Sequence, residues 1–341
     1  MIESSAAPLL ADAPTAIRVC APGRLHLGFL DPSGSLGRRF GSVGLVIEGF
    51  ESEIVICSAS EDAVVADTPG ARTELDRVAA CLQRLRERTG RRERLVLRLH
   101  HALPAHAGFG SGTQLALAVG RAFALWHGLN IATATLASWL GRGQRSGIGI
   151  AGFDQGGLLV DGGPGADGAA APLLARAELP RSWRIVVVMD ERARGLSGPD
   201  ERTAIAGLPP LPQAQAADVC HQVLMRVLPG AAEAQFAPFA AGINRVQRLV
   251  GDHFAPAQSG SRWTSPAVAR LMQWWQASVG DGAAIGQSSW GPTGFAIVPS
   301  AAAAQGLIED AQAAGVVDAA LVLRVVAGRN HGAVIDLHAK R

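Results

Sequence analysis

The feature that most constrains the fold is a glycine-rich segment, residues 104–113, that runs directly into an apolar pattern over 111–126. Glycine lets a backbone turn where a side chain would clash. Exposed amides at a helix start, together with the helix dipole, attract anions. We therefore predict a phosphate- or pyrophosphate-binding loop made of Gly108, Gly110, Ser111, Gly112, Thr113 and Gln114. A glycine-rich connection that binds nothing is the competing interpretation, because the pattern is neither a P-loop nor a Rossmann fingerprint.

The composition excludes several classes of protein. The 341 residues suffice for two domains of ordinary size. A net charge of +2, from 31 basic and 29 acidic residues, offers no basic surface, so we expect no nucleic-acid partner. No stretch reaches the roughly 18 unbroken apolar residues of a membrane span, and the first basic residue is Arg18, so we expect neither membrane contact nor a signal peptide. The four cysteines lie far apart without a C-x-x-C pair, which favours a reducing, cytoplasmic setting.

Apolar periodicity predicts two α+β units, which we divide near residue 180 into domains 1–180 and 181–341. In the first we expect strands at 17–20, 95–99 and 157–160, two strands within 44–56, and helices at 73–89, 111–126 and 133–142. The glycine-dense stretch 141–168 should hold only that one strand. In the second we expect strands at 183–189, 319–326 and 332–337, a strand–turn–strand over 283–298, and helices at 213–228, 231–249, 265–278 and 301–314.

Two further segments bring polar residues together. In the first, residues 21–45, strand alternation puts Arg24 and His26 on one face, and Asp31 follows before a glycine-rich turn. The second is Gly-Gln-Ser-Ser-Trp-Gly-Pro, residues 286–292, where two glycines flank Gln287, Ser288, Ser289 and Trp290. The second segment alone is more typical of a hairpin turn. A histidine beside an arginine is usually structural, but the shared face of Arg24 and His26 favours a functional role in the first segment.

In order and spacing, these three segments resemble the GHMP kinase superfamily over most of the chain, about residues 20–295. The first resembles its opening motif, residues 104–113 its phosphate loop, and residues 286–292 its late glycine motif. The resemblance implies an α+β fold, with an N-terminal α/β sandwich, a C-terminal ferredoxin-like domain and a site between them.

Two departures from the kinase pattern stand out. The segment Ser146-Gly147-Ile148-Gly149 has glycine where many of these kinases carry an aspartate base, and Gly112 replaces a second serine of the phosphate loop. A kinase of this type needs that carboxylate to deprotonate the substrate hydroxyl. An ATP-dependent small-molecule kinase therefore becomes the alternative, and it is favoured again if another acid such as Asp154 takes the place of the missing one.

A narrower resemblance, to the β-ribofuranosylaminobenzene 5'-phosphate synthases, a GHMP-related family of methanopterin biosynthesis, accounts for both departures. The matching residues are Arg24–Leu27, Asp31, Gly34, Gly37-Arg38, residues 41–45, residues 145–149, residues 153–157, residues 161–163, residues 195–198 with Glu201, and residues 286–292. Phe40 and Asp190-Glu191 depart from the pattern.

This resemblance implies a pentosyl transfer in which phosphoribosyl pyrophosphate and 4-aminobenzoate or 4-hydroxybenzoate form a C-riboside and release CO₂ and pyrophosphate. It implies Mg²⁺ beside the pyrophosphate, and no consumption of ATP. Arg24 or Arg145 would bind the benzoate carboxylate, Asp31 or Asp154 would stabilise the oxocarbenium-like centre, and His26 would accept the ring substituent's proton. Ser146, Gly147 and residues 287–290 would line the substrate cleft. A homodimer is the default assembly.

Two other interpretations remain. The apolar run that ends in Asp190-Glu191 faintly resembles the phosphoribosyl-pyrophosphate loop of type I phosphoribosyltransferases, but it lacks their threonine-rich turn, so we favour an ordinary strand end. A catalytically inactive sensor of a phosphometabolite is a third class of function, which the retention of Arg24, His26 and Asp154 counts against.

Overall fold

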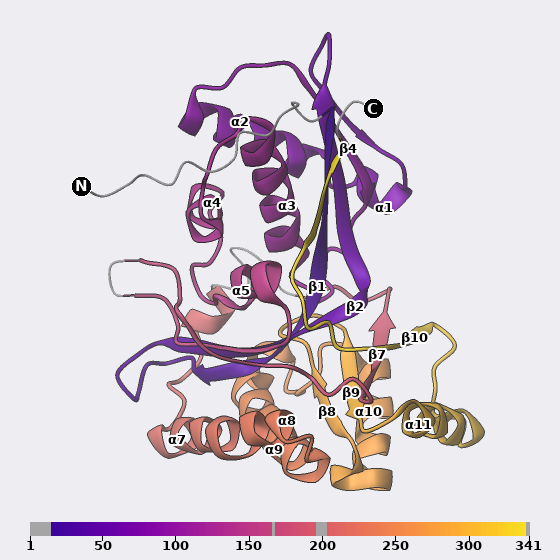
Figure 1. The fold of residues 1–341 in the computed structure, drawn as a ribbon. Coiled ribbons are helices and arrows are strands. Elements are labelled where there is room, and N and C mark those ends of the chain that lie inside the picture. The colour runs from indigo at the N-terminus through magenta and orange to yellow at the C-terminus, as the bar shows by residue number, and fades with distance from the viewer. Residues whose placement is uncertain (1–14, 166–167, 196–202, 339–341) are drawn as a thin grey trace.

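The computed structural model describes residues 15–165, 168–195 and 203–338, which form two β-sheets with a shared hydrophobic core (Figure 1). The first sheet is built on two long antiparallel strands, β1 (Ala16–Asp31) and β2 (Phe40–Ser58). The predicted strands at 17–20 and within 44–56 were too short. Gly49, at φ +75°, bends β2 without ending it, so the two strands expected there are one.

Of the remaining strands of the first sheet, β11 pairs with β1, β4 and β5 pair with different halves of β2, and β3 and β6 pair with β4 and β5 respectively. The order is β11-β1-β2-β4-β3, and β5 joins the first half of β2 and carries β6 at its other edge. Their bounds are Ala63–Ala66 (β3), Leu95–His101 (β4), Leu158–Asp161 (β5), Leu173–Ala177 (β6) and Val334–His338 (β11).

The helices of the first half are α1 (Pro69–Arg72), α2 (Leu75–Thr89), α3 (Ser111–Trp126), α4 (Thr133–Trp139) and α5 (Ile148–Gln155). Those predicted at 73–89 and 111–126 are confirmed. Helix α5 was missed, because the glycine-dense stretch 141–168 was expected to hold only one strand. A Cβ on Gly149 would come within 2.9 Å of Thr113, and one on Gly152 within 2.9 Å of Val46, so these glycines permit close helix packing instead.

The second sheet is antiparallel with the order β10-β7-β9-β8. Its strands are β7 (Arg184–Asp190), β8 (Ala284–Gln287), β9 (Gly294–Val298) and β10 (Leu321–Val326). Val186 and Val188 face α10 (Pro266–Val279) and α11 (Ala301–Ala313), whereas Ile185 and Val187 share the core with the first sheet and α9 (Phe236–Phe254). This strand order with its crossing helices is the β-α-β-β-α-β arrangement, so the ferredoxin-like expectation is confirmed.

Between β7 and α9 the chain forms one interrupted helical stretch, consisting of α7 (Gln213–Gln222), a π-helical turn, η1 (Val223–Val227), and α8 (Leu228–Ala232). Short 3₁₀ turns, η2 (Ala255–Gln258) and η3 (Gly280–Gly282), follow α9 and α10. The helix expected at 213–228 is therefore present but contains a π turn.

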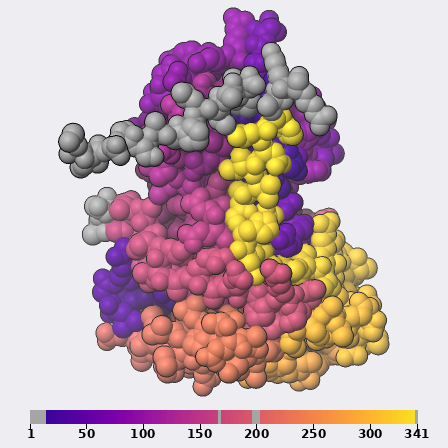
Figure 2. All heavy atoms as spheres, in the orientation of Figure 1, coloured from indigo at the N-terminus to yellow at the C-terminus, as the bar shows by residue number. Residues whose placement is uncertain are grey.

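Strand β11 lies in the first sheet although it comes last in the chain. It pairs antiparallel with β1, from Ala16 opposite His338 to Cys20 opposite Val334. Figure 2 shows this C-terminal segment, in yellow, lying over the N-terminal half. The division expected near residue 180 falls between β6 and β7, which belong to different sheets, but a single cut there separates β11 from the sheet that it completes.

Candidate functional site

The glycine-rich loop ends in an uncapped helix start. Gly110 has φ +75° and is the N-cap of α3, and it has no side chain to bond to the first-turn amides. The amide of Thr113 bonds back to the Gly110 carbonyl, while the helix begins at Ser111. The first amides of a helix lack intrahelical partners and attract negative charge. The loop therefore has the geometry of an anion site.

The late glycine motif docks directly onto this loop and onto β1. The carbonyl of Gly108 accepts hydrogen bonds from Ser288 Oγ and from Arg24 Nη1, both at 2.7 Å. Ser288 Oγ in turn accepts a bond of 2.9 Å from the His26 amide. A Cβ on Gly291 would lie 2.4 Å from the Ala107 backbone, so only glycine allows this approach. The three predicted motifs thus meet at one place.

Cationic side chains surround the helix start. The guanidinium of Arg24 lies 2.9 Å from the position of a Cβ on Gly110, and that of Arg142 lies 3.3 Å from one on Gly112. Burial lowers the pKa of Arg142, and its Nε has no hydrogen-bond partner among the described residues. Arg142 was missed as a site residue, although the arginine-rich run 142–145 was a usable signal.

A buried carboxylate shapes the segment that carries Arg145, Ser146 and Gly147. Asp161 Oδ2 accepts from Ser146 Oγ at 3.0 Å and from the Gly147 amide at 2.8 Å, and Oδ1 accepts from the Gly163 amide at 2.8 Å. Burial raises the pKa of Asp161 despite these bonds. Ser146, predicted to line the cleft, therefore uses its hydroxyl to hold the turn. Asp161 matched the family pattern without an assigned role, and the structure makes it a positioning residue.

His26 is buried beside the arginines. Burial lowers its pKa to about 3, and the charges of Arg24 and Arg145 act in the same direction, so the imidazole is neutral at neutral pH. Its side chain is 4% exposed, and Nε2 has no partner among the described residues. The site therefore holds one uncharged, unsatisfied nitrogen next to several cations.

The lowered pKa of His26 makes stability depend on pH. Because its ordinary pKa is 6.5 and its folded pKa is about 3, the unfolded chain binds more protons between these values, and stability is lost as the pH falls. From pH 6.5 to pH 5 the loss amounts to about 2 kcal/mol. We expect His26→Gln to remove this part of the acid sensitivity. Urea unfolding at both pH values measures it, and equal losses in variant and wild type would refute the assignment.

The two acidic site candidates lie elsewhere. Asp31 ends β1 and is buried, and its carboxylate accepts from the amides of Ser33, Gly34 and Leu36 and from Ser35 Oγ, so it stabilises the turn after β1. With roughly 3.3 Å of rise per strand residue, about 20 Å of strand separate it from Arg24. Its carboxylate is thus used by the turn at the far end of β1, and its predicted role at the oxocarbenium-like centre stays a prediction.

Asp154 is exposed near the end of α5 and accepts a bond of 2.6 Å from Thr133 Oγ1, which accepts one from Arg121. Arg121 lies ten residues along α3 from Ser111, or about 15 Å at 1.5 Å per residue. Asp154 therefore lies away from the start of α3, and its predicted site role stays a prediction.

Among the residues that the structure describes, no other acid contacts the place that Gly149 leaves. That position faces the methyl group of Thr113, and Gln114 Nε2 donates to the Gly149 carbonyl at 2.8 Å. Gln114 is fully buried. Gln114 and the Thr113 methyl group therefore contribute to the packing of α3 against α5. Of the predicted loop, residues 108–112 are left to face an anion.

The remaining predicted cleft residues form a wall beside His26. The Gln287 amide nitrogen donates to Gln258 at 3.0 Å and to the Ser289 carbonyl at 2.9 Å. The Ser289 amide donates to the His26 carbonyl at 3.2 Å. Trp290 is buried, and its indole nitrogen has no partner among the described residues. This wall belongs to a pocket that also contains His26.

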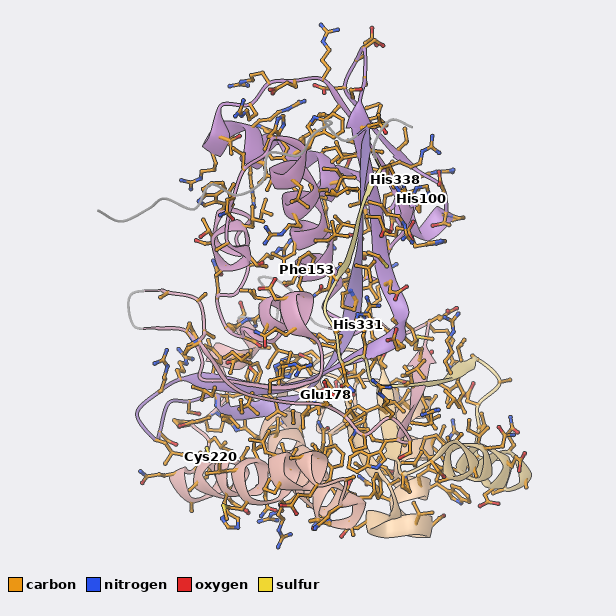
Figure 3. The ribbon with its side chains drawn as sticks, viewed as in Figure 1. His100, Phe153, Glu178, Cys220, His331 and His338 are labelled. Carbon is orange, nitrogen blue, oxygen red and sulfur yellow. The ribbon has the colours of Figure 1, made fainter. Side chains whose placement is uncertain are left out.

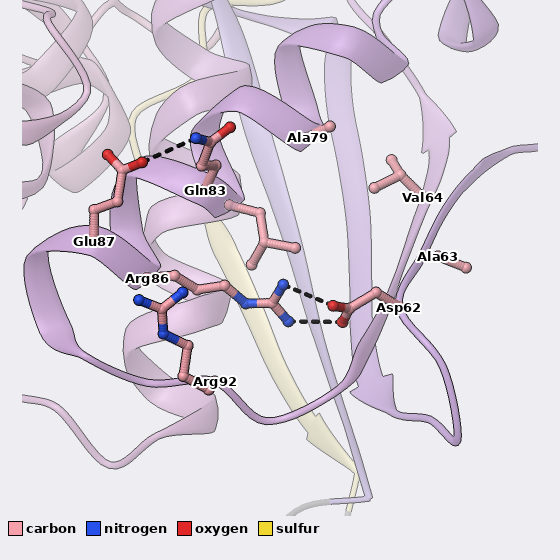
Figure 4. Close-up of a pocket in the computed structure, with 9 residues that line it drawn as sticks. Asp62, Ala63, Val64, Ala79, Gln83, Arg86, Glu87 and Arg92 are labelled. Atoms are coloured by element: carbon pink, nitrogen blue, oxygen red, sulfur yellow. Dashed lines mark hydrogen bonds and ion pairs between the residues drawn. The ribbon is translucent and has the colours of Figure 1, made fainter.

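Two larger cavities lie outside this pocket. A groove of about 430 Å³ between β3 and α2 is closed at one side by the Arg86–Asp62 ion pair and is remote from the loop (Figure 4). Another, of about 480 Å³, borders residues 104–107 and the end of β7. Asp190 there accepts from Arg192 at 2.9 Å and from Ser265 at 2.7 Å, as expected of an ordinary strand end.

The described part of the chain contains neither a clustered metal site nor a membrane-spanning helix. No group of three or more His, Cys, Asp or Glu residues gathers there as a metal site. His100 and His331 lie in different regions (Figure 3), beside Asp67 and Glu48 respectively. None of the described helices is long and apolar enough to cross a membrane. The match at 195–198 with Glu201 falls largely outside the described residues.

Comparison with known proteins agrees with this geometry. The family model of the GHMP kinases N terminal domain matches residues 76–158. The beta-ribofuranosylphenol 5'-phosphate synthase of Archaeoglobus fulgidus is 36% identical over 245 residues, which are 68% of this chain and 76% of that protein. The enzyme of the same name from Methanothermobacter thermautotrophicus is 31% identical over 294 residues, covering 81% and 87% of the two chains.

Solved structures with low identity share the fold. A phosphomevalonate kinase from Streptococcus pneumoniae is 12% identical, with a TM-score of 0.66 over 93% of this chain and all of that one. A homoserine kinase from Cytophaga hutchinsonii is 13% identical, with a TM-score of 0.61 over 97% of this chain and all of that one. The GHMP-like fold that the motifs predict is therefore confirmed.

Proposed function

Because the chain belongs to the beta-ribofuranosylphenol 5'-phosphate synthase family, we propose that it transfers a 5-phosphoribosyl group from phosphoribosyl pyrophosphate to a para-substituted benzoate. The observation that carries the proposal is the uncapped start of α3 facing arginines and a neutral His26, with glycine where a kinase base would stand. This site suits departure of a diphosphate better than activation of a hydroxyl.

The reaction balances without an added base. A ring carbon bonds to the anomeric carbon, and the bond from that carbon to the diphosphate oxygen breaks. The ring–carboxyl bond then breaks, and its electron pair restores the aromatic ring as CO₂ leaves. The amides at 110–112 with Arg24 and Arg142 stabilise the negative charge that develops on the diphosphate, which is the largest contribution such a site makes.

We include Mg²⁺ in the proposal as an ion that would bind mainly to the phosphates of the substrate. The described residues at the helix start are arginines, glycines and the hydroxyl of Ser111, a set that binds anionic oxygen directly and offers few oxygen ligands to a metal. Mg²⁺ commonly binds through substrate phosphates and water with few protein ligands. It would supply charge neutralisation of the leaving diphosphate.

The relatives are named for a ribofuranosylphenol, so we propose 4-hydroxybenzoate ahead of 4-aminobenzoate as the acceptor. The product would then be an intermediate of methanopterin biosynthesis. We also propose that the protein is a homodimer in the cytoplasm. The four free cysteines support a reducing compartment. Size-exclusion chromatography with light scattering tests the dimer.

One assay tests the reaction. The protein is incubated with Mg²⁺, phosphoribosyl pyrophosphate and either benzoate labelled at its carboxyl carbon, and CO₂ and pyrophosphate are measured. We expect both in equal amounts and only when both substrates are present. Absence of both products, with ATP consumed against a small alcohol, would favour the kinase alternative.

Replacement of Asp154 separates the two activities further. Asp154 is the acid that would restore the kinase interpretation, but it lies at Thr133, away from the loop. We expect Asp154→Asn to keep turnover within about three-fold of wild type, because the change is isosteric and its partner is a neutral hydroxyl whose bond is worth about 1 kcal/mol. A loss of a hundred-fold or more in kcat would restore Asp154 to the site.

A further inference from the structure

The pocket beside His26 has aromatic walls. Phe29 and Phe254 have ring centroids 6.2 Å apart, Trp290 lies 4.7 Å from Phe254, and the His26 ring lies 4.6 Å from Phe29. Arg262 is the one exposed residue of the lining, so it marks the solvent end. The pocket therefore runs from His26, through three aromatic rings, to Arg262.

Two polar atoms of this pocket lack partners. His26 Nε2 and Trp290 Nε1 are both buried and bond to nothing among the described residues. The amides of the wall are satisfied: Gln247 Nε2 donates to the Leu27 carbonyl at 2.7 Å, and Gln287 Oε1 accepts from the Thr264 amide at 2.6 Å. Buried polar groups without partners are rare and costly. The two nitrogens are thus available to a ligand with a polar group.

We propose that this pocket binds the aromatic ring of the carboxylate acceptor, an inference that rests on the transferase function proposed above. An aromatic ligand gains edge-to-face contacts with phenylalanine and tryptophan beyond the burial of its surface. Of the residues that line the pocket, the motifs placed Gln287, Ser289 and Trp290 only in the cleft at large, and gave His26 a proton-accepting role.

The position of the pocket fixes the orientation of its ligand. The His26 amide donates to Ser288 Oγ, which donates to the Gly108 carbonyl of the loop, so the His26 end adjoins the anion site. The ring carbon that joins the sugar bears the carboxylate and must face that site. The carboxylate therefore lies beside His26, and the para substituent points toward Arg262. His26 then binds the carboxylate, in place of the proton-accepting role expected from the sequence.

Entry requires a side chain to turn aside, because the space between the walls is about 30 Å³. Arg262 pairs with Asp252 at the surface, and the two side chains are 43% and 52% exposed. Such exposed ion pairs contribute little to stability. Arg262 is therefore the side chain at the solvent end that moves at the least cost. Phe254 packs against both Phe29 and Trp290, so admission of a ring also requires these aromatic side chains to move apart.

Calorimetric titration of the full chain with 4-hydroxybenzoate, with pyrophosphate present, tests the pocket. We expect Phe254→Leu to weaken benzoate binding about ten-fold, because the ring contacts are lost. Trp290→Phe keeps a ring but removes the indole N–H, and we expect about a five-fold loss. Phe236→Leu is the matched control: Phe236 makes an edge-to-face contact with Trp183 outside the pocket, and its replacement should leave the affinity unchanged.

The outcomes separate this inference from the proposed reaction. Pyrophosphate titrated alone should bind all variants within two-fold of wild type. Two results would overturn the assignment of the pocket, even if CO₂ is released. One is that 4-hydroxybenzoate shows no saturable binding to the wild type. The other is that the wild type and both pocket variants bind it equally. If binding weakens only in the two pocket variants, the pocket binds the aromatic ring. This conclusion holds even where the wild type releases no CO₂ and the transferase proposal fails. Thermal melting of each variant verifies that it is folded.

Discussion

Arg24→Ala is expected to lower kcat/KM by about a hundred- to a thousand-fold while the protein remains folded. The Arg24 guanidinium donates to the Gly108 carbonyl at 2.7 Å and lies against Gly110 at the start of α3. It thus joins β1 to the loop and places positive charge where the diphosphate would depart. Removing a group of this kind affects the transition state more than the ground state, so kcat should fall more than KM rises.

A second arginine on the same strand provides the control. Arg18 also lies on β1, but it pairs with Glu53 at 2.7 Å and with Asp336 at 2.8 Å, away from the loop. Arg18→Ala should therefore keep turnover near wild type, at the cost of a small loss in melting temperature. Initial rates of CO₂ release and circular dichroism melts of both variants check the pair. Unchanged kcat/KM in Arg24→Ala would remove Arg24 from the site.

The loop and its neighbours were predictable because their function depends on local backbone chemistry. Gly108, Gly110 and the apolar helix after them specify a turn and an amide cluster within a few residues. The late motif was recognisable for the same reason, since Gly291 is required by a backbone contact with Ala107. Strand β7 was predicted because both of its faces are buried, which makes it apolar throughout.

Other features depend on tertiary contacts that a linear pattern does not contain. Asp31 and Asp154 looked catalytic beside matching motifs, but each carboxylate is used by a neighbouring turn or hydroxyl. Arg142 enters the site only because α4 ends beside the start of α3. The pocket near His26 needs Phe254, more than 200 residues away in the chain. Strand β11 joins the first sheet by pairing with β1, which no local signal at residue 334 indicates.

Gly108→Ala is expected to reduce kcat/KM by at least about a hundred-fold, because it would separate the late motif from the loop. Gly108 has φ +96°, and a Cβ there would lie 2.5 Å from the Ser288 carbonyl oxygen, a backbone atom that has no freedom to rotate away. Relief requires the segment 286–292 to shift. Ser288 links the loop to the His26 amide, so the shift would displace the imidazole and Arg24 together. Displacements of about 1 Å in a site can cost a hundred-fold in rate.

Gly128→Ala separates this steric effect from backbone strain. Gly128 also has a positive φ, +62°, but a Cβ there would meet nothing within 4 Å. Both substitutions carry the left-handed strain of a non-glycine residue, roughly 1–2 kcal/mol, so both should lower the melting temperature. Only Gly108→Ala should also abolish most of the CO₂ release and weaken 4-hydroxybenzoate binding. Suppose instead that both variants lose stability and both keep their turnover. Docking of the late motif on the loop is then not required for catalysis, and the loop acts as an anion site without the late motif.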